Sequence, residues 1–439
     1  MRTYLKFLIR CFRLSFVGDY RYYAWMFLLT VFVLLGINAY CKQLVYGLAT
    51  TGMTDQVSWG FYIANFTFLV GMAAAAVMLV IPVYIYRNRE LHDLVIFGEL
   101  FAVAAIIMAM LFVTVDLGRP ERFHHLLLRF NFPVSMLTWD VLVLNGYLLL
   151  NLHICGYLVY CAYRRRQPSK LFYIPFVFVA IAWAISIHTV TAFLYSGLGG
   201  RPFWNSAVIA PRFLASAFGA GPAFLILTLQ VIRATTAYQV TDRALLTLRN
   251  IVTVAMTINM FLLGSEVFTE FYTDSAHVAS AKYLFFGLHG RHALVGWIWT
   301  AIALNVVALV ILYLPLSRGV RFLNTACVLL IAGVWIEKGM GLIVPAFIPT
   351  PLGEIVEYTP TLNESLVTMG IWAFGLLAYT ILVRVTIPVL SGQLTHDRPY
   401  DPSAPALTHS DHHESEHPVS SAPTPVGDDA TNARPEGVH

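Results

Sequence analysis

Ten long apolar stretches divide this chain, and they constrain its fold more than any other feature. Each exceeds the roughly 20 residues that an α-helix needs to cross about 30 Å of hydrocarbon. They cover residues 24–45, 58–86, 94–115, 134–162, 171–196, 207–234, 245–272, 291–314, 320–344 and 362–388. Only 12% of the 439 residues are charged, whereas a soluble domain carries about 25%. The sequence therefore predicts an all-α membrane protein of about ten transmembrane helices.

The charges of the connecting loops predict the orientation of these helices. The N-terminus and the loops at 163–170 and 315–321 fall on one side, which is about twice as basic as the other. Because basic loops stay inside, both termini should be cytoplasmic. The outer loops are longer and contain aromatic residues such as Trp204, so they could form a docking surface. No basic run suggests nucleic acid as a partner.

Both ends of the chain differ from the membrane domain at 24–390. In the segment 1–23, basic residues recur every three or four positions, while apolar residues fill the other face. The basic positions are Arg2, Lys6, Arg10 and Arg13, and the apolar ones are Leu5, Leu8, Ile9, Phe12 and Phe16. This pattern predicts either a cytoplasmic amphipathic helix on membrane lipid or a simple positive-inside anchor. The polar tail 391–439 cannot bury a core and is predicted to be a disordered cytoplasmic segment.

A shift of about 150 residues superimposes one part of the apolar pattern on another. Stretches two to five then align with stretches six to nine, and His188 falls on Lys338, Asp116 on Glu266 and Gly71 on Gly221. Four helices is an even number, so both copies would have the same orientation, as in parallel transporter repeats. The shift suggests two pseudo-repeated four-helix bundles, with the first and tenth helices flanking them.

Ionisable and amide side chains inside the stretches are costly in lipid, so each is a candidate functional residue. Those of the outer third are Asn65, Asp116, Asp140, His188, Glu266, Glu270 and Glu337. Glu99 and His153 lie deeper toward the inside. Such groups can serve function, or they can simply hydrogen-bond one helix to another. Because so many lie at one depth, we favour a functional site there.

This set of residues suits a quinone, which takes protons together with electrons. We expect His188 to bind a quinone carbonyl and carry a proton, with Asp116 and Asp140 holding or relaying protons. Asn65 could donate to a carbonyl, and Trp59 and Tyr195 could hold the flat ring. Further residues form a possible proton path: Glu99, His153, Glu266, Glu270, Glu337 and Lys338.

Other chemistries compete with a quinone site. The five cysteines are scattered, without CxxC or CxxCH spacing, so we expect no iron–sulfur cluster, c-type haem or metal site in this chain. A b-type cytochrome subunit needs paired histidines, and His153 and His188 lie at different depths. An ion or solute transporter could use the same carboxylates and the same repeat, so that alternative stays open.

Several segments resemble the NrfD/PsrC family of quinone-interacting membrane subunits, over about residues 15–390. They are VSWGFYIANFTFLVGMAAAAVMLVIP (57–82), VDLGRPERF (115–123), SIHTVTAFLYSGLGGRPFWNSAVIAPRFLASAFGAGP (186–222), GSEVFTEFY (264–272) and WIEKGMGLIVPAFIPTPLGE (335–354). The DLGRP motif marks the wide family. The strings IHTVTAFLY and WIEKGMG resemble the DsrP/HmcC branch, which includes the membrane subunit of the sulfur-metabolism DsrMKJOP complex.

The resemblance implies ten helices and two bundles, formed by helices two to five and six to nine. It implies a subunit of an oxidoreductase complex in the bacterial cytoplasmic (inner) membrane, reacting with menaquinone or ubiquinone on the outer side. The chain would exchange electrons with a periplasmic ferredoxin-like iron–sulfur subunit and carry no haem or cluster itself. The resemblance also implies three further partners: a multihaem cytochrome c, a membrane cytochrome b and a cytoplasmic iron–sulfur subunit. Such a complex could couple electron transfer to proton movement.

Overall fold

The computed structural model describes residues 2–73, 75–85, 91–273 and 278–401. Within these ranges the chain is almost entirely helical, and ten helical segments are long and apolar enough to cross a membrane. They are α2 (Tyr20–Tyr46), α3 (Phe61–Ala73) with α4 (Ala75–Val80) and the π-helical turn Ile81–Ile85, α5 (Val95–Asp116), α7 (Met136–Tyr163), α8 (Lys170–Ser196), α9 (Ile209–Thr235), α10 (Asp242–Thr273), α12 (Val295–Tyr313), α13 (Val320–Lys338) and α15 (Leu362–Leu390). The predicted all-α membrane fold is confirmed.

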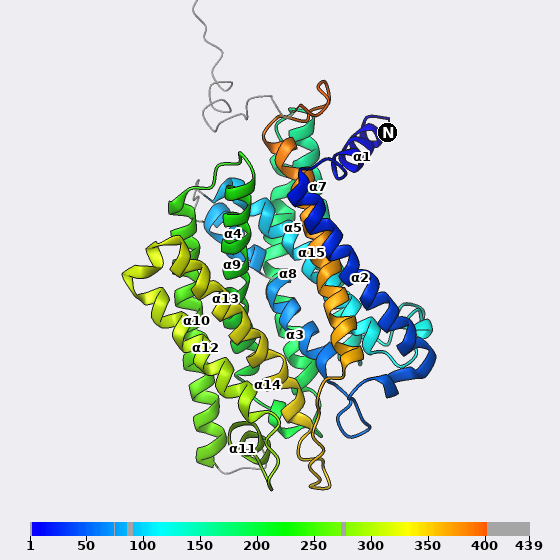
Figure 1. Cartoon of the computed structure of the whole chain (residues 1–439), viewed down its shortest axis with the longest axis vertical. Coiled ribbons are helices and arrows are strands. Elements are labelled where there is room, and N and C mark those ends of the chain that lie inside the picture. The colour runs from blue at the N-terminus through cyan, green and yellow to red at the C-terminus, as the bar shows by residue number, and fades with distance from the viewer. Residues whose placement is uncertain (1, 74, 86–90, 274–277, 402–439) are drawn as a thin grey trace, which may run out of the picture.

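The bundle has two distinct ends (Figure 1). We call the end that carries the short helix α1 (Arg2–Leu14) and the close of α15 the terminal end. The opposite end, the loop end, carries the longer connections. These contain the 3-10 turn Pro120–Arg122, α6 (His125–Leu128), the 3-10 turn Pro202–Trp204, α11 (Val278–Phe286), α14 (Met340–Ile343) and the 3-10 turn Val344–Phe347.

The predicted pair of four-helix bundles is also confirmed. The first bundle packs α3 against α5 and α7 against α8, and the second packs α9 against α10 and α12 against α13. The two bundles join where α9 lies against α3, α4 and α8. Phe101 of α5 also meets Phe224 of α9 between the bundles, and the two rings stack with their centroids 4.2 Å apart.

The two flanking helices, α2 and α15, lie on the same side of the molecule. They pack along each other and α15 also packs against α5, so both belong to the first bundle's flank (Figure 1). Gly36 and Gly370 form their closest crossing, where a Cβ atom added to Gly36 would lie 2.6 Å from the Gly370 Cα atom. Small residues permit this close approach of helices in a membrane.

Glu364, in the first turn of α15, organises the loop end beside α3. Its carboxylate accepts hydrogen bonds from the backbone N–H of Gly52 at 2.7 Å and from the hydroxyl of Tyr358 at 2.8 Å. It also completes a capping box with Thr361. The Tyr358 hydroxyl in turn accepts from the N–H of Phe61 at 2.7 Å. These contacts fix the segment that precedes α3 and carries Trp59.

The ninth span is broken near its loop end. Helix α13 ends at Lys338, and Gly339 turns the chain into α14 and the 3-10 turn Val344–Phe347. A Cβ atom on Gly339 would lie 3.2 Å from the carbonyl oxygen of Ala64 on α3, so glycine permits the close approach. Residues 340–348 are buried in protein, which is where irregular backbone at membrane depth is tolerated.

The start of the predicted polar tail packs against the terminal end. Residues 391–401 are described, and Leu394 among them is buried. The N–H of His396 donates to the Tyr163 carbonyl at 2.8 Å. Arg10 of α1 donates to the carbonyls of Thr395 and His396 and to the Tyr163 hydroxyl. The rest of the tail that was predicted to be disordered, 402–439, lies outside the described residues.

We predict that Gly370→Ala loosens the pairing of α2 and α15, because its Cβ atom would lie 2.6 Å from Gly36 Cα. Overpacking of this kind costs about 1–3 kcal/mol. The apparent melting temperature of the detergent-solubilised protein should therefore fall. Gly156→Ala is the matched control, since nothing lies within 4 Å of an added Cβ atom there. Equal melting temperatures for the two variants would contradict the prediction.

Candidate functional site

A cavity of about 410 Å³ opens at the loop end, between segments that leave the two bundles. Its walls come from three places in the chain: the residues before α3, the residues after α8 and the last residue of the turn that follows α14. The lining residues are Ser58, Trp59, Gly197, Leu198, Gly199, Gly200, Arg201 and Phe347. Glycines supply three of these eight residues, which leaves the space between the aromatic rings open.

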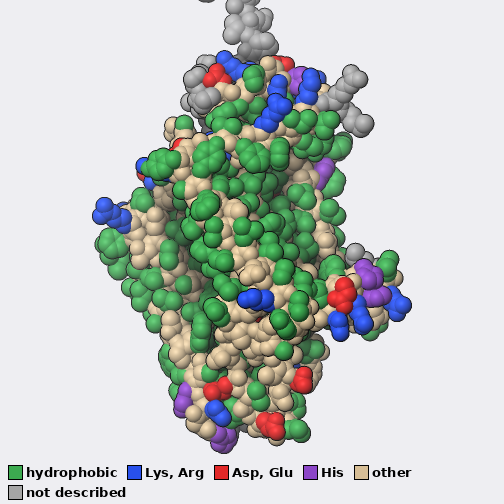
Figure 2. Space-filling model, turned by 45° about the vertical axis from the view of Figure 1, so that its right-hand side comes forward, with side chains coloured by type: hydrophobic (Ala, Val, Ile, Leu, Met, Phe, Trp, Pro, Cys, Tyr) green, Lys and Arg blue, Asp and Glu red, His purple; other side chains and the backbone are tan. Residues whose placement is uncertain are grey.

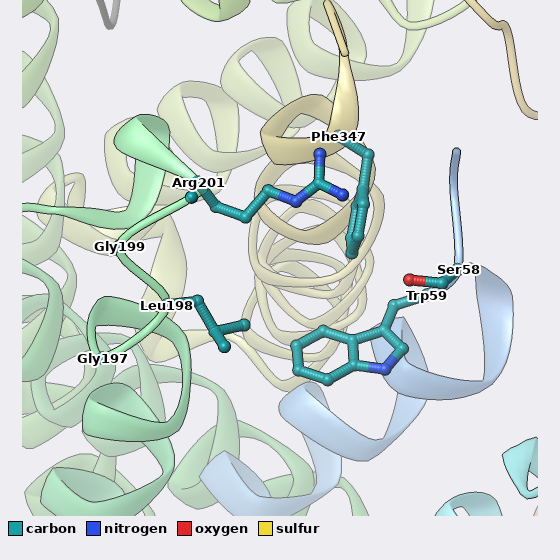
Figure 3. A pocket seen from close by; sticks show the side chains of 8 residues that line it. Ser58, Trp59, Gly197, Leu198, Gly199, Arg201 and Phe347 are labelled. Carbon is teal, nitrogen blue, oxygen red and sulfur yellow. The ribbon is translucent and has the colours of Figure 1, made fainter. Parts of the chain in front are cut away.

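Arg201 forms one wall of this Trp59 cavity. Figure 3 shows its guanidinium group extended toward the Phe347 ring, with Trp59 and Leu198 facing them. The guanidinium carbon lies 4.3 Å from the centroid of the Phe347 ring, a close cation–π contact. Partial burial lowers the pKa of Arg201 below its ordinary value. The group stays charged near neutral pH because that ordinary value is above 12. It offers several N–H donors to a ligand in the cavity.

An aromatic cluster supports the cavity from within the protein. The Trp59 ring lies 5.9 Å from the Tyr195 ring, 5.6 Å from Trp204 and 6.0 Å from Phe347. Trp204 is fully buried and its indole N–H donates to the Leu342 carbonyl at 2.9 Å. Trp204 itself is therefore not part of the outer-loop surface that the sequence suggests for docking. Its indole instead fixes the α8–α9 connection to the broken ninth span.

One buried face of α8 carries polar side chains from this cluster toward the membrane centre. The Tyr195 hydroxyl lies 2.5 Å from the Thr67 hydroxyl of α3. One turn further in, the Thr191 hydroxyl donates to Asp140 Oδ1 of α7 at 2.7 Å. His188 follows after another turn. Tyr195, Thr191 and His188 are spaced four and three residues apart, so they lie above one another on the helix.

His188 is buried beneath these two contacts. Its Nδ1 lies 2.9 Å from the Ala184 carbonyl, which only a protonated Nδ1 can use. Nε2 is buried, and no described residue forms a hydrogen bond with it. The backbone of Gly71 on α3 lies near the ring. The structure therefore brings Trp59, Tyr195, Asp140 and His188 of the predicted site into one continuous region.

Two other predicted residues make different contacts. Asn65 accepts hydrogen bonds at Oδ1 from the indoles of Trp335 and Trp372, at 3.0 and 2.8 Å, and its amide donates to the Phe61 carbonyl. Its amide is thus engaged at both ends by protein. Asp116 ends α5, and its Oδ1 is buried without a hydrogen bond from any described residue. The next residue, Leu117, lines a separate cavity of about 50 Å³.

The buried face of α7 continues the polar positions toward the terminal end. Asp140, Tyr147, Asn151 and Cys155 are all buried on it. The Cys155 thiol lies 3.3 Å from Glu99 Oε2 of α5, and Glu99 is buried one turn into that helix.

His153 does not contact Glu99, although both were predicted to belong to one proton path. Its ring packs on Tyr157 and Phe176, at the seam between α7 and α8. Its Nε2 lies 3.2 Å from the Phe172 carbonyl. The Glu99–Cys155 contact is therefore made without His153.

The second bundle is organised by the fully buried carboxylate of Glu337. Arg212 of α9 donates to its Oε1 at 3.0 Å through Nη2. Asn259 of α10 donates at 3.2 Å and Asn305 of α12 at 2.9 Å, both to Oε2. One carboxylate on α13 thus collects donors from the three other helices of its bundle. We call these four residues, with Lys338 and Glu266, the Glu337 cluster.

The remaining two members of the Glu337 cluster balance its charge. Lys338 Nζ lies 3.4 Å from Glu337 Oε1 and 5.6 Å from the centroid of the Phe213 ring. Glu266 of α10 forms an ion pair with Arg212. Two cations and two carboxylates therefore share one buried site. Glu270 lies one turn beyond Glu266 on α10, half-buried.

Arg201 and Arg212 are the important residues that sequence reasoning missed. Neither was named as a candidate site residue, yet Arg201 lines the cavity and Arg212 is only 6% exposed inside α9. A signal was available for Arg212, because it lies within an apolar stretch, where a charge is a candidate functional residue. Thr67, Thr191 and Phe347 gave no comparable signal, since threonine and phenylalanine are common in membrane helices.

Metal binding has no support in the part of the chain that the structure describes. There, no group of three or more histidine, cysteine, aspartate or glutamate side chains is placed to hold a metal ion.

Comparison with known proteins now identifies the family. Residues 49–347, more than half of the chain, match the family model described as polysulphide reductase, NrfD. The chain belongs to the NrfD family. The matched range contains Trp59, the Tyr195–His188 face of α8, Arg201, the Glu337 cluster and Phe347. Ten helices among the described residues are long and apolar enough to cross a membrane, so the chain is an integral multi-pass membrane protein.

Relatives of this NrfD-family chain are named as membrane or other subunits of oxidoreductases. It is 26% identical over 396 residues to a putative membrane subunit of dimethyl sulfoxide reductase from Halobacterium salinarum, covering 80% of this chain and 88% of the relative. It is 22% identical to the Hdr-like menaquinol oxidoreductase integral membrane subunit of Archaeoglobus fulgidus, covering 83% and 93%. It is 24% identical to a subunit of selenate reductase from Mesobacillus selenatarsenatis, covering 84% and 96%.

We predict that Arg212→Gln strongly destabilises the NrfD-family bundle. The change removes the cation that pairs with both Glu337 and Glu266, and breaking a buried pair costs about 3–5 kcal/mol. The apparent melting temperature and the yield of folded protein should both fall. Arg233→Gln is the control, because its ion pair with Asp242 is on the surface and is worth about 0–1 kcal/mol. If Arg212→Gln melted as Arg233→Gln does, the cluster would not stabilise the bundle.

Proposed function

We propose that this chain is the quinone-reactive membrane subunit of a respiratory-type redox complex, and that the Trp59 cavity binds the quinone ring. The observation that carries the proposal is the position of this cavity. It lies at the junction of the two bundles, directly above the polar face of α8. A flat redox ligand there would lie one helical turn from the first member of a row of proton-carrying side chains.

The size and the lining of the cavity support a quinone as its ligand. Its volume of about 410 Å³ falls in the range of about 300–1,000 Å³ that is typical of small-molecule sites. Trp59 and Phe347 offer flat apolar faces, and Arg201 offers charged N–H donors to a carbonyl oxygen. The name of one relative, a menaquinol oxidoreductase subunit, supports the same ligand class, menaquinone or ubiquinone.

The polar face of α8 would carry the protons of this reaction. Oxidation of a quinol releases two electrons and two protons, and the reverse reaction takes them up. We assign the first proton contacts to the paired hydroxyls of Tyr195 and Thr67, the next to Thr191 and Asp140, and the innermost to His188. Each step spans one helical turn on α8. Hydroxyl and imidazole groups can donate and accept at once, as a proton relay requires.

The other predicted residues receive more limited roles in this proposal. Glu99 could extend the row through Cys155 toward the terminal end, while His153 lies beside it at the α7–α8 seam. Glu337 and Lys338 already have partners within the Glu337 cluster, so we assign them chiefly to holding the second bundle together. Asn65 supports the site by joining α3 to α13 and α15. Asp116 and Glu270 are assigned no contact with the ligand.

The finer setting rests on the family resemblance. We propose that the loop end faces the periplasm and the terminal end the cytoplasm of a bacterial inner membrane. A periplasmic ferredoxin-like iron–sulfur subunit would then dock at the loop end and exchange electrons with the Trp59 cavity. The resemblance to the DsrP/HmcC branch suggests dissimilatory sulfur metabolism as the setting, with a multihaem cytochrome c, a cytochrome b and a cytoplasmic iron–sulfur subunit in the same complex.

We predict that Trp59→Leu raises the KM of the purified complex for a water-soluble quinol analogue roughly tenfold. Loss of one stacked aromatic wall costs about 1–2 kcal/mol. Steady-state quinol-linked electron transfer measures the effect. Trp25→Leu is the matched control, because Trp25 lies on α2 and its indole bonds to Thr380 of α15.

An unchanged KM for Trp59→Leu would contradict the assignment of the cavity. The complex must also contain redox partners for the proposal to hold, so cytochromes or an iron–sulfur protein should co-purify with this chain. Solute flux through vesicles that contain this chain alone would instead favour the transporter alternative.

We predict that Thr191→Val slows turnover roughly tenfold, because the change removes the hydroxyl between Tyr195 and Asp140. Proton transfer should then limit the rate, so the ratio of kcat in H₂O to kcat in D₂O should rise. Thr189→Val is the control on the same helix, since the Thr189 hydroxyl is exposed and bonds to the Ile185 carbonyl of its own helix. A purely structural role for Thr191 would lower the yield of the complex and leave the isotope ratio unchanged.

A further inference from the structure

Helix α1 has three faces. The sequence pattern distinguishes only a basic and an apolar face, and the structure divides the apolar residues into a buried and an exposed group. Phe7, Leu14 and the half-buried Cys11 turn toward the protein. At about 100° per residue, the apolar residues that remain exposed form a second, continuous face. They are Leu5, Leu8, Ile9 and Phe12, each between 44% and 67% exposed. Lys6 and Arg13 are exposed on a third face, between the apolar and the protein-facing sides.

The protein-facing side is anchored to the terminal end. Tyr4 and Phe7 pack edge-on against Tyr160 of α7, with ring centroids 5.4 and 5.5 Å apart. Arg10 donates at 2.7 Å to the Thr395 carbonyl and at 3.0 Å to the Tyr163 hydroxyl. These contacts fix how α1 is rotated about its axis. The apolar and basic faces therefore point in set directions and are not averaged by a free tail.

The anchored helix adds to a basic rim at the terminal end. Arg164 lies at the end of α7, with its guanidinium carbon 5.9 Å from the Tyr160 ring, on which Tyr4 also packs. Figure 2 shows Lys and Arg side chains gathered at this end, above the hydrophobic sides of the spans. A helix with an exposed apolar face beside a basic one, at the boundary of the spans, matches the boundary between lipid chains and headgroups.

We propose that α1 is a binding site for anionic phospholipid, with Lys6 and Arg13 contacting headgroups and the apolar face of Leu5, Leu8, Ile9 and Phe12 entering the acyl region. The exposed apolar area needs an occupant, and its position at the end of ten spans places it against lipid. The two exposed cations select a negatively charged headgroup, since basic residues near an anionic membrane surface each contribute about a fivefold gain in affinity. This site is independent of the quinone proposal, because α1 lies at the opposite end from the Trp59 cavity.

The test compares lipid binding by the purified full-length chain and by variants. Native mass spectrometry counts the phosphatidylglycerol and phosphatidylcholine molecules bound during titration. The double variant Lys6→Gln/Arg13→Gln should weaken phosphatidylglycerol binding at least tenfold and leave phosphatidylcholine binding unchanged. Arg318→Gln/Arg321→Gln is the matched control, because these exposed basic residues lie at the same end, in the turn before α13 and in its first turn. It should keep most of the phosphatidylglycerol preference.

An unchanged preference in the α1 double variant, or an equal loss in the control, would overturn the proposal. The charge-preserving variant Lys6→Arg/Arg13→Lys should retain binding, which separates loss of charge from loss of folding. A second experiment identifies what covers the apolar face. The photo-crosslinking residue p-benzoylphenylalanine replaces Phe12 in native membranes, with the same replacement of the lipid-exposed Phe261 of α10 as a positive control. Lipid adducts at both positions support the proposal, whereas a protein adduct at position 12 overturns it.

Discussion

Charge inside a membrane must be satisfied by protein, and this constraint shapes the second bundle. Glu337 is fully buried on α13, and it draws donors from Arg212, Asn259 and Asn305 on the three neighbouring helices. Removing water from such a group is costly unless charge and hydrogen bonds are both matched. The four helices are thereby held in one arrangement, and the broken end of α13 is held with them. That broken end carries Phe347 into the wall of the Trp59 cavity.

The buried carboxylates of the first bundle have uncharged partners. Asp140 meets a threonine hydroxyl and Glu99 meets a cysteine thiol, where Glu337 meets an arginine. The sequence repeat aligns His188 of the first bundle with Lys338 of the second, so one copy carries an imidazole where the other carries an ammonium group. The two bundles share a fold but differ in the roles that we assign to their buried polar groups. One supplies a neutralised, fixed support and the other supplies the row of groups that we assign to proton movement.

The junction of the bundles explains why the cavity lies at the loop end. Trp59 precedes α3, Arg201 follows α8 and Phe347 follows α13, so the site needs segments from both copies. Glu364 and Tyr358 fix the first of these segments, and Trp204 fixes the second through Leu342. A ligand held there touches chain connections on rigid helices, which is a common arrangement for functional sites. The α1 helix at the terminal end is remote from it and meets the membrane in a different way.

The sequence by itself determined the number, length and order of the spans. Hydrocarbon thickness imposes a minimum apolar length that is visible in any such chain, so α5 and α8 begin within one residue of the predicted stretches. It also predicted that Asp140 and His188 lie at one depth and that Trp59 and Tyr195 belong to the same site. Only the tertiary structure decided that Arg212 is buried, that Trp204 is internal, that Asn65 is tied to two indoles and that Arg201 stacks on Phe347. These outcomes depend on how helices are rotated and which neighbours they meet, because depth along a helix can be counted from sequence, whereas the direction in which a side chain points is set by packing.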